Sequence, residues 1–393
     1  MDELKRLRDQ IDEVDEDIVK LFEKRMSLSE DVAEYKRSIG KPVLDTKRQK
    51  EKVEKVRSLA HSDFNAQGVE SLFNQLMTIS RMRQYTILSG MTSEYSGFSP
   101  IEGRRLEGAK EGADFDRVPF DENTRIAYSG LAGAYGHQAM LGYFGERKAA
   151  FSVPTFQECM DAIQKGKADY GVLPIENSST GIITDVYDLM SEYDNYIVGE
   201  YVVRVSHALL ACPGAKLSDI QTVYSHPQGL LQCRDFLSDK DWREISLSNT
   251  AIAAKKVKDD GDLTQAAIAS EDAAKINGLS VLASGINDIQ NNSTRFIIIT
   301  NQKLYLRNAD QISICFELPH ASGTLYNILS HFIFNGLNMN RIESRPIPGK
   351  KWQYRFFIDF DGCLSSREVR NALTGIESET ENFRILGNYI HAE

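Results

Sequence analysis

The spacing of apolar side chains predicts one long helix over residues 2–39. Apolar positions recur at alternating steps of three and four residues, as in helices that pack against other helices along their whole length. This heptad seam consists of Leu4, Leu7, Ile11, Val14, Ile18, Leu21, Leu28, Val32, Tyr35 and Ile39. Arg25 occupies one position in the register of the seam, and Arg8 and Lys36 lie beside it. A buried guanidinium is costly without a partner, so Arg25 predicts a bound anion, a core ion pair or a side chain that reaches solvent.

Helix geometry limits which of these cations can share one ligand. At ~1.5 Å per residue, Arg25 and Lys36 lie ~16 Å apart on nearly the same face, so their long side chains can converge on one small molecule. Arg8 and Lys36 lie ~42 Å apart on a straight helix and cannot. If Arg8 binds the same kind of ligand, it must reach a copy held by a second subunit, as in an antiparallel helical dimer.

Two further helices are predicted after a break at residues 40–42. Capping-box spacing favours a short helix over residues 45–61, and a third helix follows to residue 88. The predicted buried stripe of the third helix is Val69, Leu72, Phe73, Leu76, Ile79 and Ile87. Ser80 and Gln84 lie on or beside this stripe, where apolar residues are expected, so each is a helix-edge residue or a polar contact to a ligand.

The chain changes character after the third helix. Residues 89–122 are rich in Gly, Ser, Glu and Arg without periodicity and predict a linker, with a short ordered piece around residues 98–106. From residue 124 strands alternate with amphipathic helices, which predicts an α/β domain with mostly parallel sheets. The predicted strands cover residues 125–129, 170–173, 202–210, 222–225, 266–269 and 295–300. Polar turns at 130–137 and 177–180 follow strands and lead into helices, where N–H and O–H donors can hold a carboxylate.

The C-terminal residues, 309–393, read strand, helix, strand, strand, helix, strand. The predicted elements cover 312–318, 323–335, a strand without assigned bounds, 353–360, 366–376 and 383–389. This is the order of the ferredoxin-like fold, an α+β architecture.

Composition and charge limit the function. The chain has 393 residues, 41% of them hydrophobic, and therefore predicts two or three domains. Its net charge of −10 argues against a nucleic-acid or membrane-surface partner, so an anionic substrate must be held by local clusters of cations. The five cysteines are scattered without metal-ligand spacing, which favours a reducing compartment, no structural disulfide and no metal. A charged first helix and the lack of a long apolar run predict a soluble cytoplasmic protein.

The helical segment, residues 1–88, resembles the all-helical chorismate mutases. The matching motifs are Leu7-Arg8-Asp9-Gln10-Ile11, Lys24-Arg25, Lys36, Pro42-Val43-Leu44-Asp45, Arg48 and Ser80-Arg81-Met82-Arg83-Gln84. The resemblance implies an intertwined dimer in which one arginine comes from the partner subunit. The substrate-binding residues that it implies are Arg8 (in trans), Arg25, Lys36, Asp45, Arg48, Gln49, Ser80 and Gln84, with Lys36 and Gln84 acting in catalysis. Gln49 replaces a glutamate common in that family, and a neutral amide can still accept a hydrogen bond.

Residues 123–303 resemble the prephenate dehydratases. The matching motifs are Pro174-Ile175-Glu176-Asn177-Ser178, Asp185-Val186-Tyr187-Asp188-Leu189, Tyr224-Ser225-His226-Pro227-Gln228 and Ser293-Thr294-Arg295-Phe296. The resemblance implies two lobes facing a cleft, as in periplasmic binding proteins, with Thr294 as a catalytic residue. Strand alternation puts Thr294 on one face with Phe296 and Ile298, opposite Arg295. The implied substrate-binding residues are Glu176, Asn177, Ser178, Thr180, His207, Thr294 and Arg295.

The C-terminal segment resembles the ACT regulatory domains that sense phenylalanine. The matching motifs are Gly323-Thr324-Leu325-Tyr326 and Glu343-Ser344-Arg345-Pro346. The resemblance implies an effector site formed by Gly323, Leu325, Asn338, Glu343, Ser344 and Arg345. A ferredoxin-like fold without a ligand is the alternative.

Together the segments resemble the bifunctional chorismate mutase–prephenate dehydratases of phenylalanine biosynthesis. That family converts chorismate to prephenate and then to phenylpyruvate without a cofactor, under feedback by phenylalanine, in a homodimer or higher homo-oligomer. Two other classes remain open. One is a solute-binding or sensor protein, because the two-lobed fold and the ACT domain both occur without catalysis. The other is a dehydratase whose helical segment only dimerises, although the charged Arg25 and Lys36 argue against it.

Overall fold

The computed structural model describes residues 2–89, 97–105, 116–321 and 323–392. The chain forms two compact units, one of Met1–Gly97 with Ile314–Arg384 and one of Phe98–Ser313 with Ile385–Glu393. No helix among the described residues is long and apolar enough to cross a membrane.

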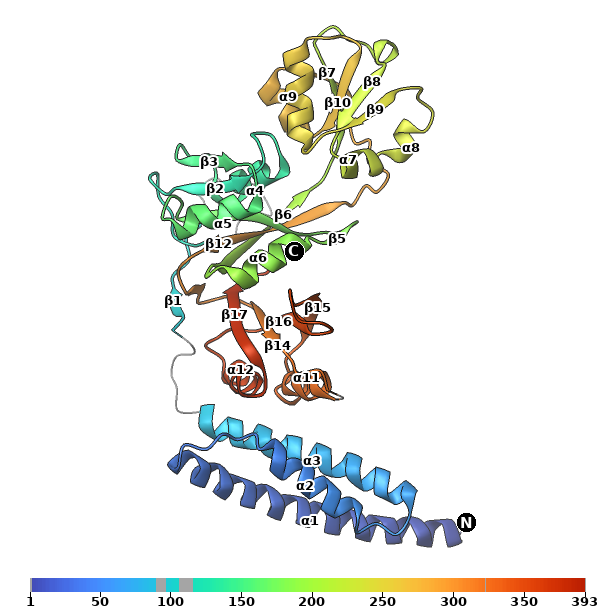
Figure 1. The fold of residues 1–393 in the computed structure, drawn as a ribbon, viewed down its shortest axis with the longest axis vertical. Coiled ribbons are helices and arrows are strands. Elements are labelled where there is room, and N and C mark those ends of the chain that lie inside the picture. Colours follow the sequence, from blue (N-terminus) through green and yellow to red (C-terminus); the bar gives the residue numbers. More distant parts are fainter. Residues whose placement is uncertain (1, 90–96, 106–115, 322, 393) are drawn as a thin grey trace. The chain divides into compact units, whose positions relative to one another are not determined.

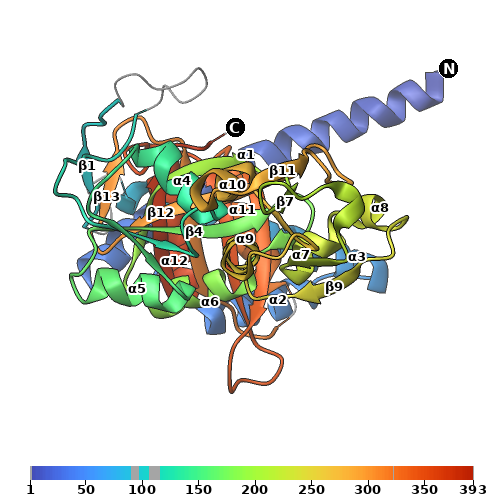
Figure 2. The same ribbon diagram turned by 90° about the horizontal axis from the view of Figure 1, so that it is seen from above.

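The first unit contains the three predicted N-terminal helices (Figure 1). They are α1 (Asp2–Ser38), α2 (Thr46–Arg57) and α3 (Asp63–Ser89). Asp45 caps α2 by accepting a hydrogen bond from the backbone N–H of Arg48 at 2.9 Å. Helix α3 packs against both α1 and α2. The first turns of α1 extend beyond these contacts (Figure 2), and the heptad seam of α1 is solvent-exposed in the single chain.

The predicted buried stripe of α3 is only partly buried, because Val69, Phe73, Leu76, Ile79 and Ile87 are half-buried. Leu72 is exposed, and the buried residues of this helix are mostly polar. They are Thr78, Ser80, Arg81, Met82, Gln84 and Tyr85. The reason is that the C-terminal half of α3 contacts helices on more than one side, so its burial does not follow a single apolar face.

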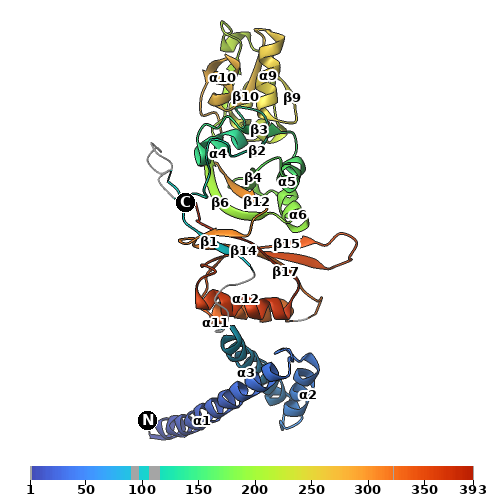
Figure 3. The same ribbon diagram turned by 90° about the vertical axis from the view of Figure 1, so that its left-hand side faces the viewer.

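The same unit contains the C-terminal elements in the predicted strand–helix–strand–strand–helix–strand order. They are β14 (Gln311–Glu317), α11 (Thr324–Phe334), β15 (Met339–Pro346), β16 (Tyr354–Asp361), α12 (Arg367–Glu379) and β17 (Glu381–Tyr389). The strand order is β15-β16-β14-β17, and α11 and α12 lie together on one face of these strands (Figure 3). Both helices pack against α3. Strands β14 and β17 each continue past the boundary of the unit.

The second unit is built on two sheets. The first has the order β6-β12-β4-β2-β3, with β5 beside β4. Its strands are β2 (Ile126–Ser129), β3 (Ala150–Val153), β4 (Tyr170–Asn177), β5 (Gly181–Ile182), β6 (Tyr196–Arg204) and β12 (Ser293–Thr300), and its helices are α4 (Tyr135–Phe144), α5 (Phe156–Gln164) and α6 (Thr184–Glu192). The second sheet has the order β11-β7-β10-β8-β9. Its strands are β7 (Ala208–Ala211), β8 (Thr222–Ser225), β9 (Arg243–Ser246), β10 (Gln265–Ala269) and β11 (Ser280–Ala283), with α7 (Pro227–Leu231), α8 (Arg234–Leu237), α9 (Thr250–Asp260) and α10 (Glu271–Asn277).

The sheets are mixed and not mostly parallel, which corrects the expectation. Strand β2 is parallel to β3 and β4, but β12 is antiparallel to both of its neighbours, β4 and β6. The predicted single strand over 202–210 is also wrong, because residues 205–207 separate β6 from β7. At this break the chain passes from the first sheet to the second, and β12 brings it back after the second sheet is complete.

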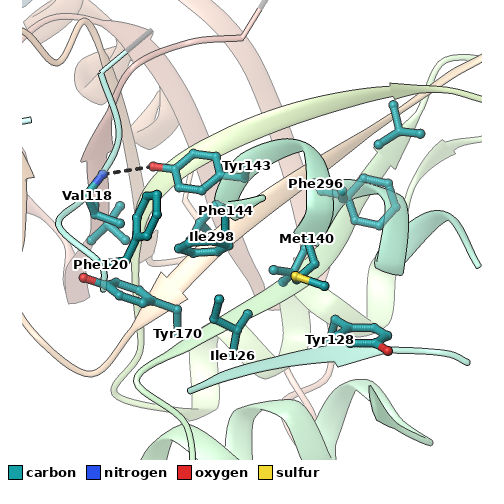
Figure 4. Packing of buried hydrophobic residues seen from close by; sticks show 14 residues of the cluster. Val118, Phe120, Ile126, Tyr128, Met140, Tyr143, Phe144, Tyr170, Phe296 and Ile298 are labelled. Carbon is teal, nitrogen blue, oxygen red and sulfur yellow. Dashed lines mark hydrogen bonds between the residues drawn. The ribbon is translucent and has the colours of Figure 1, made fainter. Parts of the chain in front are cut away.

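The core of the first sheet fixes the strand that carries Thr294. Phe296 and Ile298 of β12 pack in a cluster with Met140, Phe144 and other residues of α4 and the neighbouring strands (Figure 4). Thr294 shares their face of the strand, as alternation predicted. In the predicted linker, β1 (Ser99–Ile101) pairs in parallel with β13 (Leu304–Leu306). This confirms an ordered piece there, and the part of it at residue 106 lies outside the described residues.

Candidate active sites

The three N-terminal helices enclose a cavity of about 250 Å³. Seven of the eight residues predicted for the mutase site line it: Arg25, Lys36, Asp45, Arg48, Gln49, Ser80 and Gln84. Arg8 is not among the lining residues and is exposed on α1. The helical geometry therefore brings together the cations expected from one subunit and leaves Arg8 outside.

Arg25 and Lys36 are held in place by hydrogen bonds to backbone carbonyl oxygens. Arg25 Nη1 donates to the carbonyl oxygen of Leu76 at 2.8 Å, and it also contacts the hydroxyl of Ser80. Lys36 Nζ donates to the carbonyl oxygen of Val43 at 2.6 Å. Burial lowers the pKa of Arg25, and burial also lowers the pKa of Lys36 although the nearby carboxylate of Asp45 opposes this. The charged groups of both side chains therefore lie in a partly desolvated space.

The charge of this cavity suits an anion. Its lining contains five cationic side chains, those of Arg25, Lys36, Arg48, Lys52 and Arg81, and one carboxylate, that of Asp45. Neither Lys52 nor Arg81 is among the site residues predicted from the sequence. Lys52 lies one helical turn after Arg48 on α2, a spacing that could have identified it.

The second unit has a larger cavity, of about 480 Å³. Four of the predicted dehydratase residues line it: Asn177, Thr180, His207 and Thr294. Strand residues of the first sheet line it together with the turns and helices that follow β8 and β9 of the second sheet. The cavity therefore lies where the polar turns of an α/β unit were expected to gather.

Three predicted residues are not among those that line this cavity. Glu176 forms an ion pair with Arg295 at 2.9 Å, and the Nε of Arg295 lies 3.1 Å from Glu200. These side chains project from the other face of β4 and β12, opposite Thr294. Ser178 accepts a hydrogen bond from the backbone N–H of Ser293 at 2.9 Å. The geometry gives these residues a role in holding strands together, and it does not bring them to the cavity.

Asn177 is the central hydrogen-bonding residue of the second cavity. Its Nδ2 donates to Thr294 Oγ1 at 2.9 Å and to Asn292 Oδ1 at 2.7 Å. Its Oδ1 accepts from the backbone N–H of Ser179 at 3.0 Å and from that of Thr180 at 3.2 Å. Because the oxygen is occupied by N–H donors, the amide has only one orientation that satisfies its partners.

His207 lies in the break between β6 and β7. Gln232 donates through Nε2 to Ser179 Oγ at 3.0 Å, so its Oε1, 3.0 Å from His207 Nε2, must accept. His207 Nε2 therefore carries the hydrogen, and Nδ1 lies 3.0 Å from the hydroxyl of Tyr135. Burial lowers the pKa of His207, and the hydrogen bond with Gln232 raises it to a smaller extent. The lowered pKa favours the neutral ring.

Two helix N-termini also line the second cavity. Ala134 to Gly136 begin α4, and Asn249 and Thr250 begin α9. Their free backbone N–H groups attract anions. A Cβ on Gly136 would lie 2.4 Å from the carbonyl oxygen of Ser129, so only glycine lets α4 begin this close to the end of β2. The turn over 130–137 had indicated α4, but Tyr135, Gln232 and Asn249 carried no separate signal.

The predicted effector residues lie on α11 and β15. Gly323 precedes α11 with φ of 82°, and Leu325 is in the first turn of the helix. Asn338 lies just before β15, and its side chain donates a hydrogen bond to Asp361 at 2.9 Å. Glu343, Ser344 and Arg345 lie on β15, the outer strand of its sheet, opposite Phe357, Phe356 and Arg355.

Two family models match the segments of the chain that form the two cavities. The family model for chorismate mutase type II matches residues 7–85, and the model for prephenate dehydratase matches residues 126–304. A bifunctional chorismate mutase/prephenate dehydratase of Aquifex aeolicus is 30% identical over 391 residues, which cover 99% of this chain and 98% of that protein.

Solved structures resemble about two thirds of the chain. A prephenate dehydratase of Arthrobacter aurescens in complex with L-Phe is similar with a TM-score of 0.63 and 30% identity, over 68% of this chain and 90% of that chain. A protein described as a novel type of quorum-quenching acylase is similar with the same TM-score and identity, over 67% of this chain and 97% of that chain. The fold alone therefore does not determine the reaction.

These matches define an enzyme with an isomerase domain followed by a carbon–oxygen lyase domain. The chain belongs to the family of bifunctional chorismate mutase/prephenate dehydratases.

Proposed function

We propose that this protein rearranges chorismate to prephenate in the helical cavity and converts prephenate to phenylpyruvate in the second cavity, as part of phenylalanine biosynthesis in the cytoplasm. The observation that carries the first half is the set of five cations around one cavity of about 250 Å³. The second half is supported by Thr294 and two helix N-termini around one cavity. Neither reaction requires a cofactor.

The mutase reaction is an intramolecular rearrangement, so the site needs no nucleophile. It holds a dianion in its compact reactive conformer and stabilises charge at the breaking ether oxygen. Arg25, and Arg8 from a partner subunit, bind the carboxylates, while Lys36 and Gln84 donate to the ether oxygen. Arg48, Ser80, Asp45 and Gln49 complete the polar lining.

The dehydratase reaction breaks two bonds of prephenate. The ring carboxylate leaves as carbon dioxide, the electron pair of that carbon–carbon bond forms the aromatic ring, and the ring hydroxyl leaves as water after taking up one proton. Hydroxide is a poor leaving group, so a donor at the hydroxyl oxygen lowers the barrier. Thr294 supplies a hydrogen bond to that oxygen, because Asn177 already donates to Thr294 Oγ1 and leaves its O–H free to donate. The helix N-termini of α4 and α9 bind the carboxylate that remains.

Product analysis tests this function directly. The purified protein is incubated with chorismate and the products are identified by mass, then the same is done starting from prephenate. We expect prephenate and then phenylpyruvate from chorismate, and phenylpyruvate from prephenate. Tight binding of either acid without turnover would favour a solute-binding protein instead.

We further propose that phenylalanine binds the C-terminal domain beside Leu325, Asn338 and the segment Glu343 to Arg345. The L-Phe complex of the similar Arthrobacter dehydratase supports phenylalanine as the ligand. A ligand changes activity only if it prefers one conformation of the protein. Glu343→Ala and Ser344→Ala should therefore weaken the effect of phenylalanine on the dehydratase while its activity without phenylalanine stays unchanged. Unaltered sensitivity in both variants would put the effector elsewhere.

The exposed seam of α1 supports a homodimer. Eleven large apolar side chains between residues 4 and 39 are exposed in one chain, among them Leu21 at 67% and Tyr35 at 66%. An apolar face of this length is unfavourable in water and is covered by a second copy of the same helix. The dimer also brings Arg8 of one subunit to the cavity of the other.

A further inference from the structure

Arg81 connects the mutase cavity to the C-terminal domain within the first unit. It lies on α3, lines the cavity and is 6% exposed. Its Nε donates to Glu379 Oε1 of α12 at 2.9 Å. Its Nη2 donates to Thr78 Oγ1 at 3.2 Å, and its Nη1 donates to Gln49 Oε1 at 3.3 Å. One guanidinium therefore joins three elements, α12, α3 and α2.

Glu379 is a buried and well-partnered anion. Its side chain is 5% exposed, Tyr85 donates to Oε1 at 3.3 Å, and His331 Nε2 lies 3.6 Å away. Burial alone would raise the pKa of Glu379, but His331 and Arg81 outweigh burial and lower it. A Cβ on Gly375 would lie 2.2 Å from the ring of His331, so this glycine is needed for α12 to approach α11 so closely. Glu379 is thus a fixed negative charge behind the mutase cavity.

The contact with Arg81 determines what Gln49 can offer to a ligand. A guanidinium has only donors, so the oxygen of the Gln49 amide must face Arg81. The amide nitrogen has no hydrogen-bond partner among the described residues, and Gln49 lines the cavity. Position 49 therefore presents a donor to the ligand, in contrast to the acceptor that the sequence analysis expected.

We propose that Glu379 is a positioning residue of the mutase site, which fixes Arg81 and, through Arg81, the donor side of the Gln49 amide. The proposal rests on the mutase function given above. The C-terminal domain then supplies the outer layer of a site whose lining comes from the helical domain. Arg81 and Gln49 contact parts of the substrate other than the breaking bond, so this layer contributes to binding in the ground state and the transition state alike. Loss of such uniform binding raises KM and leaves kcat nearly unchanged.

The test measures KM and kcat for chorismate in Glu379→Gln, Arg81→Gln and the double variant. Glu379→Gln removes the charge and keeps the size, and we expect KM to rise about tenfold with kcat within about twofold of wild type. The double variant should be no worse than Arg81→Gln alone, because Glu379 acts through Arg81. Prephenate turnover by the same preparations should stay at the wild-type level. Tyr326→Phe is the matched control, since it removes a hydrogen bond between α11 and α3, to Gln75 at 3.2 Å, and should leave KM unchanged.

Several outcomes would overturn the proposal. A wild-type KM in Glu379→Gln, or additive effects in the double variant, would show that Glu379 does not act through Arg81. A fall in kcat at unchanged KM, with a lower melting temperature, would mean that Glu379 only stabilises the fold. Should Glu379→Gln not fold, Arg81→Lys keeps the charge but lacks the planar guanidinium whose separate nitrogens reach Glu379 and Gln49, and an unchanged KM there would contradict the proposal. Lack of chorismate turnover by the wild-type protein would instead contradict the proposed function.

Discussion

At the scale of single residues, Asn177 decides what the hydroxyl of Thr294 can do. The backbone N–H groups of Ser179 and Thr180 fix the amide oxygen of Asn177, so its nitrogen must face Thr294 Oγ1. Thr294 accepts that hydrogen bond and directs its own proton elsewhere. A threonine in a strand is ordinarily only a good β-former, and it is this fixed donor beside it that makes Thr294 suited to assist a leaving hydroxyl.

Removal of the Thr294 hydroxyl should therefore impair only the dehydratase. Thr294→Val keeps the size and β-branching of the side chain, and losing one such donor typically lowers kcat by ~10²–10³. Phenylpyruvate formation from prephenate measures the loss, and prephenate formation from chorismate should stay normal. Thr294→Ser is the matched control and should retain most of the activity. Near-normal phenylpyruvate production by Thr294→Val would refute the role.

The buried imidazoles make the stability of the second unit depend on pH. Burial lowers the pKa of His207 below its ordinary value of 6.5, and the pKa values of His137 and His226 are lowered in the same way. The unfolded chain then takes up protons below about pH 6.5 that the folded chain refuses, so stability falls as pH falls through this range. In His207→Gln the melting temperature should fall less between pH 7.5 and 5.5 than in wild type. The same or a steeper slope in the variant would contradict this.

At the scale of elements, helices and strands with a periodic sequence pattern could be predicted, whereas contacts between distant segments could not. The helix α1 follows from a repeat that is visible along the sequence, and it is confirmed. The βαββαβ order at the C-terminal end is confirmed for the same reason. The antiparallel pairing of β12 with β4, and the contact of Arg81 with Glu379, join segments more than a hundred residues apart and leave no local periodic signal. The polar burial on α3 was missed because that helix has two sets of neighbours.

The seam of α1 yields a prediction at the same scale. Leu21 is 67% exposed in one chain, and a second copy of α1 is proposed to cover it. Leu21→Lys puts a charge into that interface and should shift the protein from dimer to monomer in analytical ultracentrifugation. Chorismate turnover should fall with it, because the monomer lacks Arg8 from a partner. Glu16→Lys, on the opposite face of α1, is the control that should leave the dimer intact.

At the scale of the whole molecule, each compact unit combines segments that are far apart in the sequence. Residues 385–393 belong to the second unit, where Gly387 pairs with Ile197 of β6 and His391 contacts Glu200. A truncation near Arg307 would therefore remove part of the dehydratase unit and uncover β6. Point variants on β15 test regulation by phenylalanine more cleanly, because they leave these contacts in place.

The dimer itself can be tested by complementation between two inactive variants. Arg25 lines the mutase cavity of its own chain, whereas Arg8 is exposed and absent from that lining. On a straight helix Arg8 lies ~42 Å from Lys36, too far for one subunit to place both on one small ligand. Each complete site should then take Arg8 from one subunit and Arg25 from the other, so Arg8→Ala and Arg25→Ala homodimers should both be nearly inactive.

Co-expression of the two variants should restore part of the mutase activity. A heterodimer collects both defects in one site and leaves the other site complete. Random pairing of equal amounts gives half heterodimers with one good site each, so about one quarter of the wild-type mutase activity should return. Mixing the purified homodimers is the control, and it should restore activity only as fast as subunits exchange. If the co-expressed protein is no more active than its two parents, Arg8 and Arg25 do not act in sites shared between subunits. Only shared sites allow a heterodimer to collect both substitutions in one site and to leave the other site complete.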